Sequence, residues 1–346
     1  MVFSTSNQSV LRAEAKFFVA NVYKLYESIG PCVRHTPLLS SSLGNGHGDL
    51  LLKCENLQHT GSFKYRSALA ALFCYQHYHP KIWDLILKEG IITYSTGNFA
   101  KALAYVAHQK NLKLTVLVHE SVELKKIASI MAYHPETAVV KLSLEMWKSI
   151  VISGCYKGSR GFFIASAMDP YVTLGNATLG VEILKESPNI DSIIIPHGSG
   201  NLVYGLSRFL KYFKPNICIH TVEVKSRSPF FESFKVNRPI TVPHKNTFVD
   251  GLSAAFLIPE QFYRIKPFIE EPLVVSSGQI ARTIVKLALH EKLVTEGAGA
   301  AAVAAGIYSR VRKPVCCIIS GGNTDPTSFV KLVKRYAGQT SEGASK

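Results

Sequence analysis

Short apolar runs that are rich in β-branched residues alternate along this chain with segments of helical periodicity. The runs predict strands at residues 91–94, 114–118, 139–142, 162–165, 192–195, 217–222 and 315–319. The helical periodicity predicts helices near residues 65–76, 98–110, 121–132, 145–157, 177–187, 201–213, 278–292 and 298–309. Because strands and helices alternate, we expect right-handed βαβ units and mainly parallel sheets with helices on both faces.

The units of strand and helix between residues 88 and 163 form a continuous block. We expect this block to build a small lobe with its own sheet, and residues 1–87 and 164–346 to build a larger lobe around a second sheet. The expected fold is therefore α/β, with two open, mainly parallel, twisted sheets. A chain of 346 residues, 47% hydrophobic and 18% charged, is long enough for two such cores.

Composition limits the surroundings that we expect for the protein. No apolar run reaches membrane-spanning length, and the first residues lack the basic and apolar regions of a secretory signal. The seven cysteines are scattered, and none forms a Cys-x-x-Cys pair that would suit a metal. We therefore expect a protein of a reducing compartment, the cytoplasm, with no membrane partner.

The formal net charge of +15 raises the question of an acidic partner. The basic residues are spread along the chain and do not interleave with aromatic residues. We expect a solvated basic surface and no nucleic-acid partner. An anionic cofactor or a small-molecule substrate would use only a few of these charges.

Lys64 is the residue whose position points most clearly to chemistry. It follows a Gly-Ser turn at residues 61–62 and precedes a helix of small residues. A half-shielded lysine beside the backbone N–H groups of a helix start is disfavoured in its charged form. Its neutral amine can form a Schiff base with an aldehyde. The alternative interpretation is a solvated lysine at a helix entrance.

Three loops marked by glycine, at residues 95–98, 198–201 and 320–323, follow predicted strands. In open α/β sheets, ligands bind at the carboxyl ends of the strands. Hydroxyls and free N–H groups in the first loop suit a carboxylate or a phosphate, and the two glycines of the second let the backbone close around an anion. The serine hydroxyl of the third can hydrogen-bond a heteroaromatic nitrogen without carrying charge. Each loop could also be an ordinary capped turn.

Glu296 is a further candidate, because the tiny residues at 297–302 would let a flat group approach closely. Its alternative role is to cap a tightly packed helix. A Schiff-base lysine, an anion loop, a neutral partner for a pyridine nitrogen and a carboxylate loop together describe one cofactor. That cofactor is pyridoxal 5′-phosphate.

From residue 34 to residue 323 the chain resembles the β-family (fold type II) of pyridoxal-phosphate enzymes, whose architecture is like that of the tryptophan synthase β subunit. The resemblance is closest to the threonine/serine dehydratase and serine racemase group. It rests on the three loops, on Thr-Pro-Leu at 36–38, on residues 53–64, on Val-Asp-Gly-Leu at 249–252 and on Glu-Gly-Ala-Gly-Ala at 296–300.

The resemblance implies that the larger lobe binds the cofactor, that the smaller lobe gates the substrate, and that each candidate residue has a role. Lys64 would form the Schiff base and move the α-proton. Asn98 would contact the ring oxygen, and Ser320 the pyridine nitrogen. Phe63 and Glu296 would also contact the cofactor, and its phosphate would be held by Gly198, Ser199, Gly200, Asn201 and Leu202. The substrate carboxylate would be received by Ser95, Thr96, Gly97 and Asn98.

The chain departs from this group at several positions. Ser199 and Asn201 replace two glycines of the usual phosphate loop, and Phe99 stands where a histidine is common. Glu223 matches a metal-site residue of the group, but Arg227 nearby would repel a cation. We therefore expect no tight divalent metal site.

The reaction expected from the resemblance removes water and ammonia from L-threonine or L-serine and gives a 2-oxo acid. Racemisation is an alternative, for which Thr96 occupies the position of the second acid/base. Threonine synthase-like β/γ-replacement is another alternative, because residues 169–178 are closer to the threonine synthase pattern. A catalytically silent cofactor-binding protein is a third. The resemblance also implies a homodimer.

Overall fold

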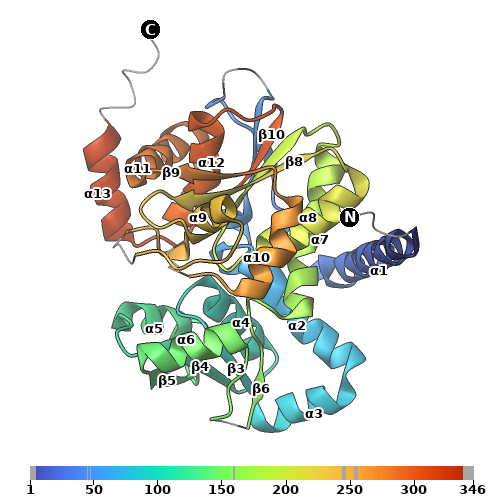
Figure 1. The fold of residues 1–346 in the computed structure, drawn as a ribbon. Coiled ribbons are helices and arrows are strands. Elements are labelled where there is room, and N and C mark those ends of the chain that lie inside the picture. Colours follow the sequence, from blue (N-terminus) through green and yellow to red (C-terminus); the bar gives the residue numbers. More distant parts are fainter. Residues whose placement is uncertain are drawn as a thin grey trace.

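The strands of this protein form two sheets, one in each of two lobes (Figure 1). The computed structural model describes residues 5–44, 46, 48–158, 160–243, 247–252 and 256–337. In Figure 1 the larger lobe lies above the smaller one, and it contains elements from both ends of the chain. Residues 338–346, which we expected in the larger lobe, lie outside the described residues. The lobe boundaries at 87/88 and 163/164 stay a prediction.

The larger sheet has the strand order β1-β2-β10-β7-β8-β9. Its strands are β1 (Leu38–Ser40), β2 (Leu50–Lys53), β7 (Ser192–Pro196), β8 (Cys218–Val224), β9 (Glu271–Val275) and β10 (Val315–Ile318). All neighbours are parallel except β1 and β2, which are antiparallel. Leu50 pairs with Val315, so strands that are far apart in the sequence lie side by side in this sheet.

The smaller sheet is parallel throughout and has the strand order β5-β4-β3-β6. Its strands are β3 (Ile91–Tyr94), β4 (Leu114–His119), β5 (Ala138–Leu142) and β6 (Phe162–Phe163). The two mainly parallel sheets confirm the fold class that the alternation of strands and helices predicts.

Helices pack on both sheets (Figure 1). They are α1 (Thr5–Ile29), α2 (Lys64–Tyr78), α3 (Pro80–Glu89), α4 (Asn98–Gln109), α5 (Leu124–Met131), α6 (Leu144–Ser153), α7 (Pro170–Glu186), α8 (Asn201–Phe213), α9 (Pro229–Val236), α10 (Pro259–Ile265), α11 (Ser277–Lys286), α12 (Gly297–Tyr308) and α13 (Pro326–Tyr336). In Figure 1, α4 lies at the top of the smaller lobe, next to the larger lobe. Among the described residues, no helix is both long enough and apolar enough to cross a membrane.

The core of the larger lobe is built around α12. The alanine and valine side chains at residues 300–305 are fully buried. At Gly306 an added Cβ atom would lie 2.7 Å from the Cys317 sulfur of β10, so only glycine allows this close approach of helix and strand. Cys316 and Cys317 are both buried and free, and they fill this core as small hydrophobic residues.

The sequence predicted seven of the ten strands in the described part of the chain, but several elements were missed, among them α1, the longest helix there. The missed strands are β1, β2 and β9, which have three to five residues each and too little alternation for a periodic signal. The missed helices are α1, α3, α9, α10 and α13. The last four begin at a proline, a residue that favours the first turn of a helix.

Three predicted helices have different ends in the structure. The helix expected at 177–187 begins at Pro170, because the Asp169 carboxylate accepts the N–H groups of Tyr171 and Val172 and caps α7. The helix expected at 145–157 ends at Ser153, where Gly154 adopts a φ of 63°. The helix expected at 278–292 continues past α11 as a π-helix, Leu287–Glu291.

Candidate active site

Four loops meet where parallel strands of the two sheets end. β2, β10 and β7 are neighbours in the larger sheet, and the loops after them carry Lys64, Ser320 and Gly198. Neighbouring parallel strands end at the same edge of a sheet, so these three loops share one edge. The fourth loop follows β3 of the smaller sheet and brings Asn98 to within 2.6 Å of Glu296 in the larger lobe.

The loops of Lys64 and Ser320 are joined by backbone hydrogen bonds. The N–H of Phe63 donates to the carbonyl of Ser320 at 3.1 Å, and the N–H of Gly322 donates to the carbonyl of Gly61 at 2.9 Å. Lys64, which we expected to form a Schiff base, therefore directly follows Phe63, whose N–H is hydrogen-bonded to the carbonyl of Ser320.

Lys64 is the first residue of α2, and its amine lies among aromatic rings. Its Nζ is 4.6 Å from the centre of the Phe63 ring and 5.8 Å from that of Phe99. Within the described ranges it has no carboxylate partner and no hydrogen bond. Burial therefore lowers the pKa of Lys64 to about 8. A substantial fraction of the amine is neutral in weakly alkaline solution, as a nucleophile or base requires.

The backbone of the glycine loop lies close to residues of neighbouring segments just before α8 begins. Gly200 has a φ of +87°, a left-handed conformation that L side chains rarely adopt, and an added Cβ atom would lie 2.6 Å from Ile265 Cδ1. At Gly198 a Cβ atom would lie 2.8 Å from the carbonyl oxygen of Gly251. The N–H groups of the first turn of α8 have no partner within the helix and carry a partial positive charge. The Ser199 side chain is exposed beside them.

Asn201 is the first residue of α8, and its side chain anchors the glycine loop from behind. Its Nδ2 donates to the carbonyl of Ser166 at 3.1 Å, and its Oδ1 lies 3.4 Å from Asn176 Nδ2. The Asn176 Oδ1 in turn accepts the hydroxyl of Ser67, which lies one helical turn after Lys64. This chain of buried polar groups fixes α2, α7 and α8 relative to one another. The sequence analysis gave no role to Asn176 or Ser67.

Both ends of the Asn98 amide are engaged across the two lobes. Its Nδ2 donates to Glu296 Oε1 at 2.6 Å, and its Oδ1 accepts from Asn323 Nδ2 at 2.9 Å. Burial raises the pKa of Glu296 to about 7, and the Asn98 hydrogen bond and the charge of Lys101 reduce that rise. Asn98 and Glu296 thus form a hydrogen-bonded pair, with Asn323 as an unexpected third member, and their contact with a cofactor stays a prediction.

The carboxylate loop begins α4 with a serine cap. The Ser95 hydroxyl oxygen accepts the N–H groups of Gly97 and Ala100 at 3.2 and 3.3 Å. Its hydroxyl proton stays available for another acceptor. Gly97 is exposed and Thr96 is partly buried, and the Thr96 hydroxyl has no hydrogen bond to any described residue.

A buried charge network supports α2 behind Lys64. The Arg66 guanidinium binds two carboxylates, Glu55 at 2.8 and 2.9 Å and Glu182 at 2.7 and 3.0 Å. Lys53 contacts Glu182 at 2.8 Å and Glu186 at 2.7 Å. Lys53 and Glu55 belong to the stretch that carried the resemblance, and Arg66 lies two residues after it, but the sequence alone did not show that they pair. Two carboxylates of α7 thus bind the Arg66 side chain of α2 and the Lys53 side chain of β2.

His35, Glu182 and Glu186 have ligand atoms that lie within 4.8 Å of one another. Such a group could in principle hold a metal ion. The Lys53 ammonium, however, already contacts both carboxylates, and it supplies the positive charge that an ion would bring. The cluster is therefore explained without a metal.

Glu223 serves the start of α9. Its carboxylate accepts the N–H groups of Phe230 and Phe231 at 3.1 and 2.8 Å, and burial raises its pKa to about 8. His197 lies 3.7 Å away, but burial lowers its pKa to about 4 and leaves it neutral. Arg227 is also buried close by in the sequence.

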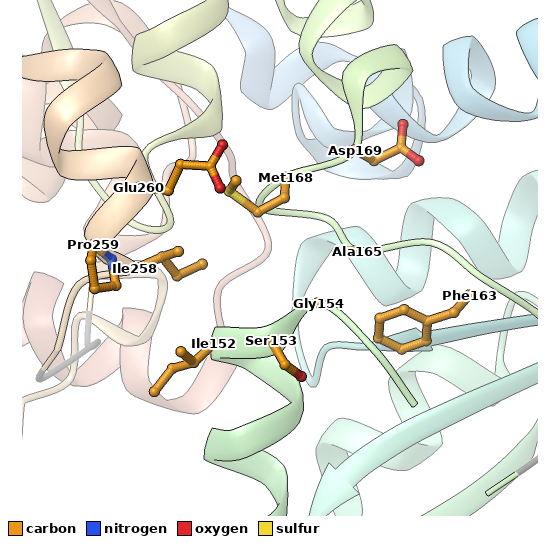
Figure 2. A pocket seen from close by; sticks show the side chains of 10 residues that line it. All are labelled: Ile152, Ser153, Gly154, Phe163, Ala165, Met168, Asp169, Ile258, Pro259 and Glu260. Carbon is orange, nitrogen blue, oxygen red and sulfur yellow. The ribbon is translucent and has the colours of Figure 1, made fainter. Parts of the chain in front are cut away.

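A cavity of about 510 Å³ lies between the end of α6, the segment after β6 and the start of α10 (Figure 2). Figure 2 shows the Glu260 side chain beside Met168, whereas the Asp169 carboxylate points away from both. Most of the lining is apolar, as with Ile152 and Phe163, and it includes no lysine, histidine or cysteine. The cavity therefore lacks the chemistry that is gathered around Lys64.

Comparison with known protein families agrees with the geometry around Lys64. Residues 29–321 match the family described as "Pyridoxal-phosphate dependent enzyme". The match includes Lys64, Asn98, the glycine loop, Glu296 and Ser320.

Two curated relatives and one solved structure are similar over most of the chain. An L-threonine ammonia-lyase of Geobacter sulfurreducens is 31% identical over 83% of this chain and 70% of its own. A catabolic L-threonine dehydratase of Staphylococcus aureus is 28% identical over 95% of this chain and 96% of its own. The crystal structure of serine racemase from Dictyostelium discoideum matches with a TM-score of 0.74 and 26% identity, over 89% of this chain and 98% of that one.

Proposed function

Because this chain belongs to the pyridoxal-phosphate dependent enzymes, we propose that it is an ammonia-lyase acting on a hydroxy amino acid of the threonine or serine type. The observation that carries the proposal is the partly buried Lys64 amine, whose pKa is lowered to about 8 where the four loops meet. The names of the two curated relatives support the reaction class.

The residues present fit the cofactor. The Lys64 amine can bind its aldehyde, and the positive start of α8 behind Gly198 and Gly200 suits its phosphate. Cβ atoms at Gly198 and Gly200 would lie 2.8 and 2.6 Å from neighbouring atoms. Glycine at both positions therefore lets the loop keep a backbone conformation in which its N–H groups are accessible. The Ser320 hydroxyl suits a pyridine nitrogen, and Asn98 with Glu296 suits the ring oxygen.

The bound cofactor supplies a sink for the electron pair that a substrate leaves on its α-carbon. Lys64 Nζ accepts the α-proton, the bond between Cβ and the hydroxyl oxygen breaks, and a double bond forms between Cα and Cβ. The hydroxyl leaves as water with one proton. Water then hydrolyses the released enamine to a 2-oxo acid and ammonia, so the net reaction consumes the amino acid alone.

The substrate carboxylate binds at the start of α4 in this proposal. The hydroxyl protons of Ser95 and Thr96 would bind the carboxylate there, because neither hydroxyl donates a hydrogen bond to a described residue, whereas the Gly97 N–H is already bonded to the Ser95 oxygen. The Ser95 oxygen already accepts two backbone N–H groups, which fixes its position and leaves its proton for the substrate. Asn98, held by Glu296, then lies between substrate and cofactor ring.

The deciding experiment assays purified protein with added cofactor for 2-oxo acid release. The panel is L-serine, L-threonine, 3-hydroxyaspartate and O-phosphohomoserine. We expect release from at least one hydroxy amino acid, and a visible absorbance band that Lys64→Ala abolishes. A protein that shows the band but neither releases oxo acid nor converts any of these compounds would be a silent cofactor-binding protein. Conversion of O-phosphohomoserine to threonine and phosphate, without oxo acid, would indicate replacement chemistry.

Racemisation is the second candidate, and one observation favours it. The Thr96 hydroxyl is partly buried and has no hydrogen bond to the described residues, so it could exchange a proton with the substrate. A racemase from Dictyostelium discoideum is among the similar structures. Formation of D-serine from L-serine, lost in Thr96→Val while oxo acid release continues, would support this activity.

We further infer that the protein is a cytoplasmic homodimer. All seven cysteines are free, five of them buried, which suits a reducing compartment. Light scattering on the purified protein would measure the oligomeric state, and a mass corresponding to 38.1 kDa would contradict the dimer.

A further inference from the structure

Lys101 is a partly buried lysine beside the candidate site, and the reaction as proposed gives it no role. It lies on α4, three residues after Asn98, so both side chains lie on the same side of the helix. Burial lowers the pKa of Lys101. Its ammonium forms neither an ion pair nor a hydrogen bond with any residue that the structure describes. A lysine that has lost part of its hydration without a protein partner is suited to bind an external anion.

The direction of the helix brings Lys101 toward the site. Side chains of an α-helix tilt toward its N-terminus, and three residues of α4 rise only about 4.5 Å. Glu296, which Asn98 binds, is close enough to Lys101 for its charge to raise the pKa of the amine. A Cβ atom at Gly321 would lie 2.5 Å from Glu296 Oε1 and 3.1 Å from Asn98 Nδ2, so this group lies against the Ser320 loop.

The charges near Lys101 leave an excess of positive charge. Lys126 of α5 lowers the pKa of Lys101, but Lys126 is itself paired with Asp250 of the larger lobe at 2.7 Å. Glu296 is the acid whose charge raises the pKa of Lys101. Burial raises the pKa of Glu296 itself to about 7. Near neutral pH a considerable fraction of Glu296 is therefore uncharged, and Lys101 is only partly compensated.

We propose that Lys101 binds a negatively charged group on the side chain of the amino-acid substrate. This inference rests on the proposed function, because the substrate carboxylate must lie at residues 95–98 for its side chain to face the next turn of α4. The preferred substrate is then a hydroxy amino acid whose side chain carries an anion, such as L-threo-3-hydroxyaspartate. Loss of water from it, followed by hydrolysis of the enamine with release of ammonia, gives oxaloacetate by the bond changes already described. A phosphate ester such as O-phospho-L-serine shares this chemistry, with phosphate leaving in place of water.

The kinetic test compares Lys101→Met with the wild-type protein on L-threo-3-hydroxyaspartate, O-phospho-L-serine, L-serine and L-threonine. A charge-assisted hydrogen bond predicts that kcat/KM for the anionic substrates falls about 10- to 100-fold. The values for L-serine and L-threonine should change less than about 3-fold. The matched control is Lys125→Met. Lys125 is an exposed lysine of α5, the helix that follows α4, and its ammonium is paired with the Glu123 carboxylate. Lys125→Met should leave all four substrates unaffected.

A binding measurement separates this inference from the proposed function. Calorimetry with succinate and butyrate, which differ in one carboxylate, needs no turnover. We expect Lys101→Met to weaken the binding of succinate about 10-fold and to leave the binding of butyrate nearly unchanged. If Lys101→Met lowers all four kcat/KM values equally, or weakens both acids equally, the anion subsite is wrong and the lyase proposal stands. If no substrate gives oxo acid but succinate binding depends on Lys101, the lyase proposal fails and the subsite stands.

Discussion

Lys64 differs from an ordinary helix-entrance lysine in the groups that surround its amine. The rings of Phe63 and Phe99 lie beside it, and in the described part of the chain no carboxylate balances its charge. Phe99 is the residue that stands where related enzymes commonly have histidine, and it is buried. This departure, which raised the possibility of a silent protein, contributes instead to the burial that lowers the pKa of the amine.

Replacing Lys64 by methionine should stabilise the cofactor-free protein at neutral pH. The folded-state pKa is about 8 against an ordinary value of 10.5, so the folded chain loses its proton first. Between pH 8 and pH 10.5 the free energy of unfolding of the wild type rises with pH. Below about pH 8 the Lys64 amine is charged in the folded state, and the wild type is destabilised by the full cost of that buried charge. Lys64→Met should therefore raise the free energy of unfolding at pH 7 by on the order of 2 kcal/mol.

Urea unfolding at pH 7 and at pH 10.5 measures this effect. The advantage of Lys64→Met should shrink toward zero at the higher pH, where the amine is neutral in the folded state and about half neutral in the unfolded state. An equal advantage at both pH values would mean that packing, and not charge, is responsible.

Gly200→Ala should damage both stability and cofactor binding. Alanine is strained at a φ of +87°, and its Cβ would meet Ile265 at 2.6 Å. We expect a loss of about 1–3 kcal/mol in the free energy of unfolding and weaker binding of the cofactor. Thermal unfolding and absorbance titration with pyridoxal phosphate would measure the two effects. Gly30→Ala, where nothing lies within 4 Å of the added Cβ, is the control and should change neither.

At the scale of the elements, the Arg66 network joins β2, α2 and α7. Arg66→Met would leave Glu55 buried without its cation and Glu182 with Lys53 as its cation partner, and breaking a buried pair in this way typically costs about 3–5 kcal/mol. Chemical denaturation would measure the loss. Arg264→Met removes an arginine that is paired with Glu260 near the surface, and this control should cost less than about 1 kcal/mol. A similar cost for the two variants would mean that the buried network adds no stability.

The sequence was sufficient for elements with a strong period and for loops that follow them. Most of the parallel strands, and the loops with Lys64, Gly198 and Ser320, could be predicted because each has a local pattern of apolar residues or glycine, whereas β2 and β9 lack such a pattern. The partners of Asn201 could not be predicted. Asn176 and Ser166 come from other elements, and only the packing of α7 against α8 brings them to it.

The same limit applies to charged residues. Nothing local distinguishes Lys53, which is completely buried and paired with two glutamates of α7, from an exposed lysine such as Lys88. Lys101 looked like one more basic residue of a helix. Its partial burial and its proximity to Glu296 depend on how the smaller lobe meets the larger one.

At the scale of the whole molecule, the net charge of +15 should speed the arrival of the anionic cofactor. Salt shortens the range of this attraction, from about 10 Å at 0.1 M to about 3 Å at 1 M. We expect the association rate of pyridoxal phosphate with the cofactor-free protein to fall several-fold over that range in stopped-flow absorbance. Pyridoxal, which lacks the phosphate, is the control. Equal salt dependence of the two would show that the charges do not steer the cofactor.

The pairing of β2 with β10 bears on how the chain is made. A chain synthesised from its N-terminus releases β2 from the ribosome long before β10 exists. Until β10 arrives, β2 has no neighbour on that side, and an open strand edge is a site for aggregation. The loops of Lys64 and Ser320 follow β2 and β10, so they cannot meet before β10 has been made and has paired with β2. Cofactor capture is therefore among the last events of folding, and a chain cut short before Val315 should neither bind the cofactor nor stay dispersed.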